Sequence, residues 1–361
     1  MTVDTRICER ARLARDPRFD GLFFTGVLST GIYCRPICPA RPPKPENIVY
    51  FPSAAAAAEA GLRPCLRCRP EAAPGSPAWN GTSATVSRAL LLIRQGALNA
   101  GSLEDLAAKL GVGSRHLRRL FQTHLGASPK NLATTQKILF AKKLLTETDL
   151  SVTQIAFASG FGSIRRFNAA FSKTYGTTPS AIRRRNNGNQ TTGSQLFQCS
   201  LTLSYRPPFH WQRMLGFFES RAIPGVEFVA GGAYRRTVRI NATTGVISVA
   251  HAASENALVL TVALSDSRDL MSIVEKVRRM FDLDANMTAV HDVLAADPVL
   301  ERSVGKQPGL RLPGAWDPFE AAVRAVVGQQ VSVKGARTVI GRITAKAGPR
   351  FTSADYPELT H

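Results

Sequence analysis

The sequence has no long apolar run. No stretch approaches the roughly 18 uninterrupted apolar residues of a membrane-spanning helix. The opening residues, MTVDTRICERARLARDPRF, also lack the apolar segment of a secretory signal peptide. We therefore expect a cytoplasmic protein without a membrane partner, in a compartment that keeps thiols reduced.

Acidic residues are scarce. The chain has 26 Asp and Glu against 46 Lys and Arg, which gives a formal net charge of +20. The imbalance is concentrated in residues 1–190, which hold 27 basic and 11 acidic residues. A surplus this large predicts a polyanionic partner, and double-stranded DNA is the first candidate. A basic surface that serves only solubility is the alternative.

Cysteine is also scarce, yet four of the six cysteines form two close pairs. Cys34 and Cys38 stand four positions apart in GIYCRPICPA, and Cys65 and Cys68 follow after 26 intervening residues. Two such pairs can supply four thiolates to one tetrahedral ion, which favours Zn²⁺. Disulfides are disfavoured in a reducing compartment, whereas an iron–sulfur cluster and a purely structural zinc knuckle stay open. The remaining cysteines have no partner at a suitable spacing: Cys8 and Cys199.

An internal repeat occupies the middle of the chain. Residues 102–129 align with residues 151–179, and each copy has a capping pattern, a helix, a glycine turn and a second helix. An apolar period over 132–148 predicts one long helix between them. The second helix of each copy is basic, through Arg115, His116, Arg118, Arg119, Arg165, Arg166 and Lys173. Two such helices can enter successive major grooves of DNA, although a solvated basic face is the alternative. The segment resembles an AraC-type DNA-binding domain.

The residues around the cysteines resemble the N-terminal domain of the Ada-type adaptive-response regulators. The similarity lies in STGIYCRPICPAR, GLRPCLRCRP and ARDPRFDGLFFTGV, and with the repeat it covers about 1–185. The resemblance implies that all four cysteines bind zinc and that Cys34 irreversibly accepts a methyl group from a DNA methylphosphotriester. It implies a transcriptional activator that works with RNA polymerase in the bacterial nucleoid. It also places three residues near the DNA-contacting surface: Thr30, Arg41 and Arg63.

The last segment departs from the Ada pattern, because it contains no Pro-Cys-His-Arg methyltransferase motif. Residues 201–227, 277–287 and 308–333 instead resemble AlkA-type 3-methyladenine DNA glycosylases. Alternation over 201–263 predicts an antiparallel sheet, and helical periodicity follows Asp317. Gln330 stands where that family has an apolar wedge; glutamine can also fill the gap left by a flipped base, and a surface position on a helix is the alternative. Core packing is favoured over a base pocket for three aromatic residues: Phe217, Phe218 and Trp316.

The glycosylase resemblance stops short of that family's helix-hairpin-helix and catalytic aspartate. We therefore expect either a fragment of a longer fusion or a degenerate glycosylase half, and we favour the fragment. Glycosylase activity is expected only if the chain is completed beyond His361.

The fold class that follows is multidomain. We expect a small α+β zinc domain, an all-α double helix-turn-helix domain, and an α+β domain that runs into the start of a helical glycosylase domain. The predicted limits are 1–75, 82–185, a linker at 186–198, 199–310 and 311–361. Three functions compete: a methyl-accepting regulator, a glycosylase recruited by the Ada-like part, and a pure transcription factor with structural zinc.

Overall fold

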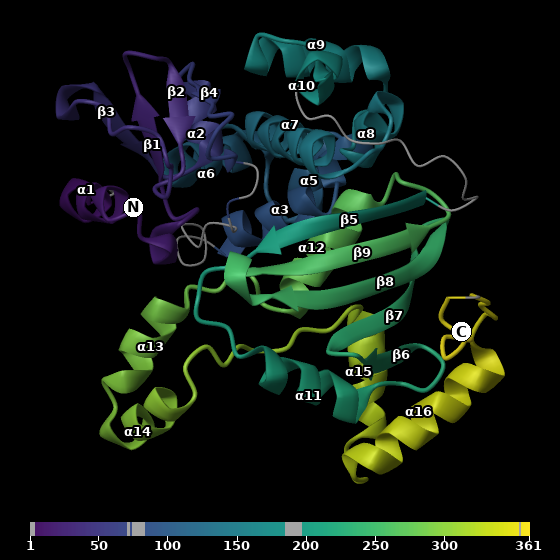
Figure 1. The fold of residues 1–361 in the computed structure, drawn as a ribbon. Coiled ribbons are helices and arrows are strands. Elements are labelled where there is room, and N and C mark those ends of the chain that lie inside the picture. The colour runs from purple at the N-terminus through teal and green to yellow at the C-terminus, as the bar shows by residue number, and fades with distance from the viewer. Residues whose placement is uncertain (1–3, 71–72, 74–83, 185–196, 354) are drawn as a thin grey trace. The chain divides into compact units, whose positions relative to one another are not determined.

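The computed structural model describes residues 4–70, 73, 84–184, 197–353 and 355–361 (Figure 1). The chain divides into two compact units. One contains residues 1–192 and 267–275, and the other contains residues 193–266 and 276–361. The predicted linker at 186–198 falls outside the described residues, except for Phe197 and Gln198.

The first part of the first unit is built on a small sheet with the strand order β3-β1-β2-β4. Strands β1 and β2 form an antiparallel hairpin, and β4 pairs with β2 in parallel. Ser53 begins the alanine-rich helix by accepting a hydrogen bond from the Ala56 amide, and Gly61 follows its end with φ of +85°. The elements are α1 (Thr5–Leu13), η1 (Pro17–Phe19), β1 (Phe24–Val27), β2 (Ile32–Cys34), η2 (Pro45–Asn47), β3 (Ile48–Phe51), α2 (Ala54–Glu59) and β4 (Arg63–Pro64).

The repeat folds as two helix-turn-helix pairs. Ser102 with Asp105, and Ser151 with Gln154, form the two predicted capping boxes. Gly111 and Gly160 take φ values of +69° and +80° in the turns, where a side chain would be strained. The predicted connecting helix is α7, one of these elements: α3 (Ala84–Arg94), α4 (Ala97–Ala100), α5 (Leu103–Lys109), α6 (Ser114–Leu125), α7 (Pro129–Glu147), α8 (Val152–Ala158), α9 (Ile164–Tyr175) and α10 (Pro179–Arg184).

The cysteine-bearing part packs directly on the helix-turn-helix part within the first unit. Ala55 of α2 belongs to the same buried cluster as Leu106 and Phe121. Arg69, the residue after the last cysteine of the quartet, donates hydrogen bonds to Thr146 Oγ1 at 2.7 Å and Glu147 Oε1 at 2.8 Å. Both parts lie in one compact unit, and the division into domains at 1–75 and 82–185 stays a prediction.

The second unit contains the predicted antiparallel sheet, with the strand order β5-β9-β8-β7-β6. Its first strand includes two residues of the predicted linker 186–198, because β5 begins at Phe197. None of the helices in the described part of the chain is long and apolar enough to cross a membrane. The elements are β5 (Phe197–Ser204), α11 (Trp211–Arg221), β6 (Glu227–Ala230), β7 (Ala233–Ile240), β8 (Thr243–Ala252), η5 (Ala253–Glu255), β9 (Ala257–Leu264), α13 (Met287–Ala295), α14 (Pro298–Lys306), α15 (Pro318–Val327) and α16 (Val333–Ala347). Helix α12 (Leu270–Met280) is divided between the units, because residues 267–275 belong to the first.

Candidate metal centre and nucleic-acid interface

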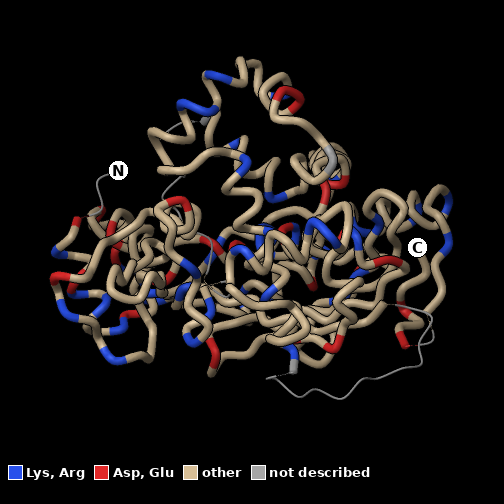
Figure 2. The backbone as a smooth tube through the Cα atoms, turned by 90° about the horizontal axis from the view of Figure 1, so that it is seen from above, with Lys and Arg blue, Asp and Glu red and all other residues tan. Residues whose placement is uncertain are grey.

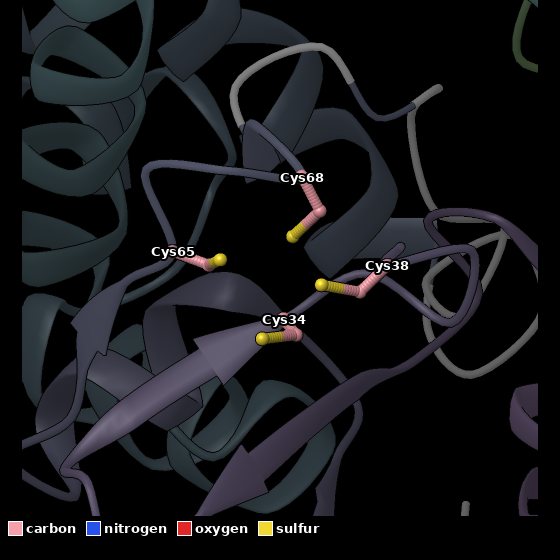
Figure 3. A group of neighbouring side chains, drawn as sticks. All are labelled: Cys34, Cys38, Cys65 and Cys68. Atoms are coloured by element: carbon pink, nitrogen blue, oxygen red, sulfur yellow. The ribbon is translucent and has the colours of Figure 1, made fainter. Parts of the chain in front are cut away.

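The four paired cysteines converge on one point. Cys34 ends strand β2, Cys38 follows in the proline-rich loop, and Cys65 and Cys68 come just after β4. Their sulfur atoms all lie within 4.8 Å of one another and point toward a common centre (Figure 3). The parallel pairing of β2 with β4 produces this convergence, because it brings the ends of both strands to the same edge of the sheet.

The quartet fits zinc. A tetrahedral Zn²⁺ with bonds of about 2.3 Å to sulfur needs ligand sulfurs about 3.8 Å apart, and the spread of up to 4.8 Å is close to that value. All four cysteines are free thiols. Zinc is therefore the cofactor of this centre, held by Cys34, Cys38, Cys65 and Cys68.

The four sulfurs have different surroundings. Cys65 and Cys68 are only 8% and 6% exposed, whereas Cys34 and Cys38 are half-buried. The Arg67 amide donates to Cys65 Sγ at 3.4 Å, and the Arg35 amide donates to Cys68 Sγ at 3.3 Å. The first pair is thus the more exposed one, although Cys65 lines the same cavity as Cys34 and Cys38.

A buried ion pair holds the loop that carries Cys38. Arg35 Nε donates to Asp20 Oδ1 at 2.8 Å, and the two side chains are 10% and 5% exposed. Arg35 Nη1 also donates to the carbonyl oxygen of Cys68 at 3.2 Å. One guanidinium thus connects the loop after Cys34 to the second cysteine pair. This pair was not predicted from the sequence, because Asp20 and Arg35 lie 15 positions apart.

The thiols influence one another strongly. A hydrogen bond with Cys34 lowers the pKa of Cys38 to about 7, and the same neighbour lowers the pKa of Cys65. Hydrogen bonding with Cys38 raises the pKa of Cys34, and hydrogen bonding with Cys34 raises that of Cys68. Four thiolates this close repel one another, and a dication is needed to hold all of them deprotonated.

A cavity of about 550 Å³ opens beside the quartet. Its lining includes Cys34 and Cys38 together with two of the predicted DNA contacts, Thr30 and Arg41. The third predicted contact, Arg63, is an exposed residue of β4. Three further lining residues were missed by the sequence analysis: Arg12, Arg15 and Thr25. Arg12 is paired with Glu9, whereas Arg15 and Arg41 are exposed cations of the lining that suit an anionic ligand.

The basic residues of the repeat lie on the exposed sides of α6 and α9. Lys and Arg, blue in Figure 2, outnumber Asp and Glu along the chain. In α6 and α9, Leu117, Phe121, Phe167 and Phe171 are buried. The predicted DNA contacts of the two helices are all exposed: Arg115, His116, Arg118, Arg119, Arg165, Arg166 and Lys173.

The second unit holds the remaining candidates. Gln330 is exposed in the loop between α15 and α16, so it lies at the surface, as in the alternative, but outside a helix. Phe218 and Trp316 are buried as predicted, and with the half-buried Phe217 they also line a cavity of about 320 Å³. The same cavity is lined by a network of ion pairs that the sequence did not reveal: Glu227, Arg236, Glu320 and Arg324.

Comparison with known proteins gives three consecutive family matches. The metal binding domain of Ada matches residues 7–71, a helix-turn-helix domain matches 106–185, and the AlkA N-terminal domain matches 200–317. The fold and the site therefore define a chain that joins a zinc-thiolate domain, a helix-turn-helix domain and a glycosylase-type domain.

Relatives span all or part of this arrangement. A probable bifunctional transcriptional activator/DNA repair enzyme AlkA from Mycobacterium tuberculosis is 44% identical, over 100% of this chain and 72% of its own length. The bifunctional transcriptional activator/DNA repair enzyme Ada of Escherichia coli is 34% identical over 47% of each chain. DNA-3-methyladenine glycosylase 2 of Escherichia coli is 34% identical over 44% of this chain and 53% of its own. The chain belongs to the family of bifunctional transcriptional activator/DNA repair enzymes represented by the Mycobacterium tuberculosis relative.

Proposed function

We propose that the protein removes methyl groups from DNA methylphosphotriesters by transferring them irreversibly to Cys34. The observation that carries the proposal is the placement of Cys34 in the zinc quartet and on the wall of a cavity that the exposed Arg15 and Arg41 also line. Cys65 and Cys68 are buried, and their sulfurs already accept amide hydrogen bonds. Cys38 and Cys65 also line the cavity, and the choice of Cys34 over Cys38 comes from the Ada resemblance.

The proposed reaction is an in-line displacement. The Cys34 thiolate attacks the methyl carbon and forms a sulfur–carbon bond. The bond between the methyl carbon and the ester oxygen of the phosphotriester breaks. The bonding pair leaves with oxygen, so the neutral phosphotriester becomes a phosphodiester anion and the thiolate becomes a neutral thioether. Bound zinc supplies the positive charge that keeps the cysteine deprotonated near neutral pH. The thioether is stable, and each protein molecule therefore reacts once.

Stoichiometry tests this proposal. We expect methyl transfer from DNA carrying methylphosphotriesters to stop at one methyl group per protein molecule, as measured by intact-protein mass spectrometry. DNA without the lesion is the control and should leave the mass unchanged. Continued turnover, or an unmodified protein after long exposure, would contradict the reaction.

We also propose that α6 and α9 enter successive major grooves through their exposed basic residues. Replacing Arg165 and Arg166 by alanine should weaken DNA binding and reduce the slope of log K against log salt by about one for each phosphate that the variant no longer neutralises. The control is Lys109→Ala, which removes an exposed cation from α5 instead. Fluorescence anisotropy at several salt concentrations measures both quantities. A double variant with the affinity and slope of Lys109→Ala would exclude α9 from the interface.

Methylation is proposed to act as the regulatory switch. Four thiolates around Zn²⁺ carry a net charge of −2, which repels the phosphate backbone, and methylation of Cys34 removes one negative charge. DNA binding should therefore tighten, more at low salt than at high salt, and produce an activator that works with RNA polymerase. Anisotropy titrations of methylated and unmethylated protein test this step. Equal affinities at every salt concentration would refute the switch but not the repair reaction.

We further propose DNA contacts outside α6 and α9. Thr30, Arg41 and Arg63 are proposed to contact DNA around the lesion, and Thr30 and Arg41 gain support from the cavity that they share with Cys34. Gln330 is a proposed DNA contact of the glycosylase-like part, supported by its exposed loop position. We propose that the predicted segments are the separate domains of the chain, joined by the linker: 1–75, 82–185, the linker 186–198, 199–310 and 311–361.

A further inference from the structure

Thr25 carries a buried hydroxyl without a partner next to the metal centre. The residue is 2% exposed, and its Oγ1 makes no hydrogen bond within the described part of the chain. A buried hydroxyl that has lost water without gaining a partner is unfavourable, and such groups are rare in native proteins. The burial of this hydroxyl without a hydrogen-bond partner therefore calls for an explanation.

The sheet register places this hydroxyl beside Cys34. Thr25 on β1 stands directly opposite Cys34 on β2 and, on its other side, opposite Tyr50 on β3. Residues directly opposite each other in an antiparallel pair share one face, with Cβ atoms about 4.5–5.5 Å apart. Thr25 and Cys34 both line the same cavity, as do Val27 and Ile32 of the same hairpin.

Cys34 is the neighbour best suited to accept a hydrogen bond from Thr25. Tyr50 presents a long ring, and its hydroxyl already pairs with Arg12 and Glu9. Val27 and Ile32 offer no polar side-chain atom. The Cys34 sulfur, in contrast, becomes a full thiolate acceptor when zinc binds, and charge-assisted hydrogen bonds are the strong ones.

We propose that the Thr25 hydroxyl donates a hydrogen bond to the Cys34 thiolate of the zinc-loaded centre and thereby restrains its nucleophilicity. This inference rests on the proposed role of Cys34 as methyl acceptor. The hydrogen bond stabilises negative charge on sulfur, and that charge moves to the phosphate as the methyl group is transferred. Because the stabilisation is greater in the ground state than in the transition state, it slows the reaction.

The restraint has a use in a protein that can react only once. Free alkylating agents reach the sulfur by diffusion and are not positioned by binding to the protein. A less nucleophilic thiolate reacts with them more slowly. The phosphotriester of bound DNA is held against the sulfur by contacts elsewhere, and positioning offsets the lower intrinsic reactivity. Thr25 is thus a residue that tunes Cys34 rather than one that touches the lesion, because its hydroxyl oxygen is closed off from solvent.

Two substitutions test the inference in the full chain. Thr25→Val keeps the shape but removes the hydroxyl, and Thr25→Ser keeps the hydroxyl. We expect the valine variant to accept methyl groups about five- to tenfold faster, from methylphosphotriester DNA and from methyl iodide alike. The serine variant should match the wild-type rate. Zinc content and thermal unfolding check that both variants are folded.

A spectroscopic measurement separates this inference from the proposed function. In protein loaded with Co²⁺, the sulfur-to-metal charge-transfer band should move to longer wavelength in Thr25→Val, because the sulfur becomes more electron-rich, and stay in place in Thr25→Ser. An unmoved band with an unchanged or slower rate would overturn the inference. If the wild-type protein accepts no methyl group at all, the proposed function fails, whereas the band position still decides the hydrogen bond.

Discussion

A Cys34→Ala variant will take up no methyl group from methylphosphotriester DNA. We expect Cys65 and Cys68 not to replace it, because both residues are buried and their sulfurs accept amide hydrogen bonds. Cys38 remains in the cavity, but the proposed reaction is specific to the sulfur at the end of β2. The measurement is the number of methyl groups per protein after exposure to the lesion.

The control variants for this prediction are Cys199→Ala and Cys8→Ala. Both cysteines lie outside the quartet, and burial raises the pKa of each thiol, that of Cys8 to about 11 and that of Cys199 to about 12. Both variants should therefore take up one methyl group, as the wild type does. Zinc content must be measured alongside, because the Cys34→Ala variant keeps only three thiolate ligands. Methyl uptake by a metal-loaded Cys34→Ala protein would show that a different sulfur is the acceptor.

Removing zinc will unfold the cysteine-bearing part of the first unit. Its two buried clusters are small, one around Phe24 and Tyr33 and the other around Cys8 and Phe23. A structural zinc site contributes on the order of 10–16 kcal/mol to folding in small domains, far more than clusters of this size can replace. The helix-turn-helix part has a much larger core around Leu117 and Phe121, and we expect it to stay folded.

Amide NMR spectra before and after chelation check this prediction. Signals from residues 4–70 should collapse to random-coil positions, while those from residues 102–183 stay dispersed. Cys68→Ala should reproduce the effect without chelator, and Cys199→Ala should not. A dispersed spectrum for residues 4–70 in metal-free protein would mean that the core alone sustains the fold.

Local patterns in the sequence were enough to predict the features that depend on near neighbours. The C-x3-C and C-x2-C spacings predicted the quartet, because each pair needs only a short loop to bring two sulfurs together. Ser102 and Ser151 predicted two helix starts, and Gly111 and Gly160 predicted the turns that follow. These features are encoded within a few residues of where they act.

Features that depend on register or on distant pairing could not be predicted in this way. The position of Thr25 beside Cys34 follows only from the register of β1 on β2. A shift of one residue would place the Thr25 side chain on the opposite face of the sheet. The ion pair of Asp20 with Arg35 joins two loops, and the pair of Glu227 with Arg236 joins two strands. The packing of α2 on the helix-turn-helix core likewise depends on surfaces that only the folded chain creates.

The central claim is that one sulfur of the zinc quartet is consumed by the lesion and that this sulfur belongs to Cys34. Peptide mapping of the wild-type protein by mass spectrometry, after reaction with methylphosphotriester DNA, tests it most directly. The account predicts a single S-methyl group on the peptide that contains Cys34 and an unmodified Cys38. A methyl group on Cys38, or on either buried cysteine, would contradict it.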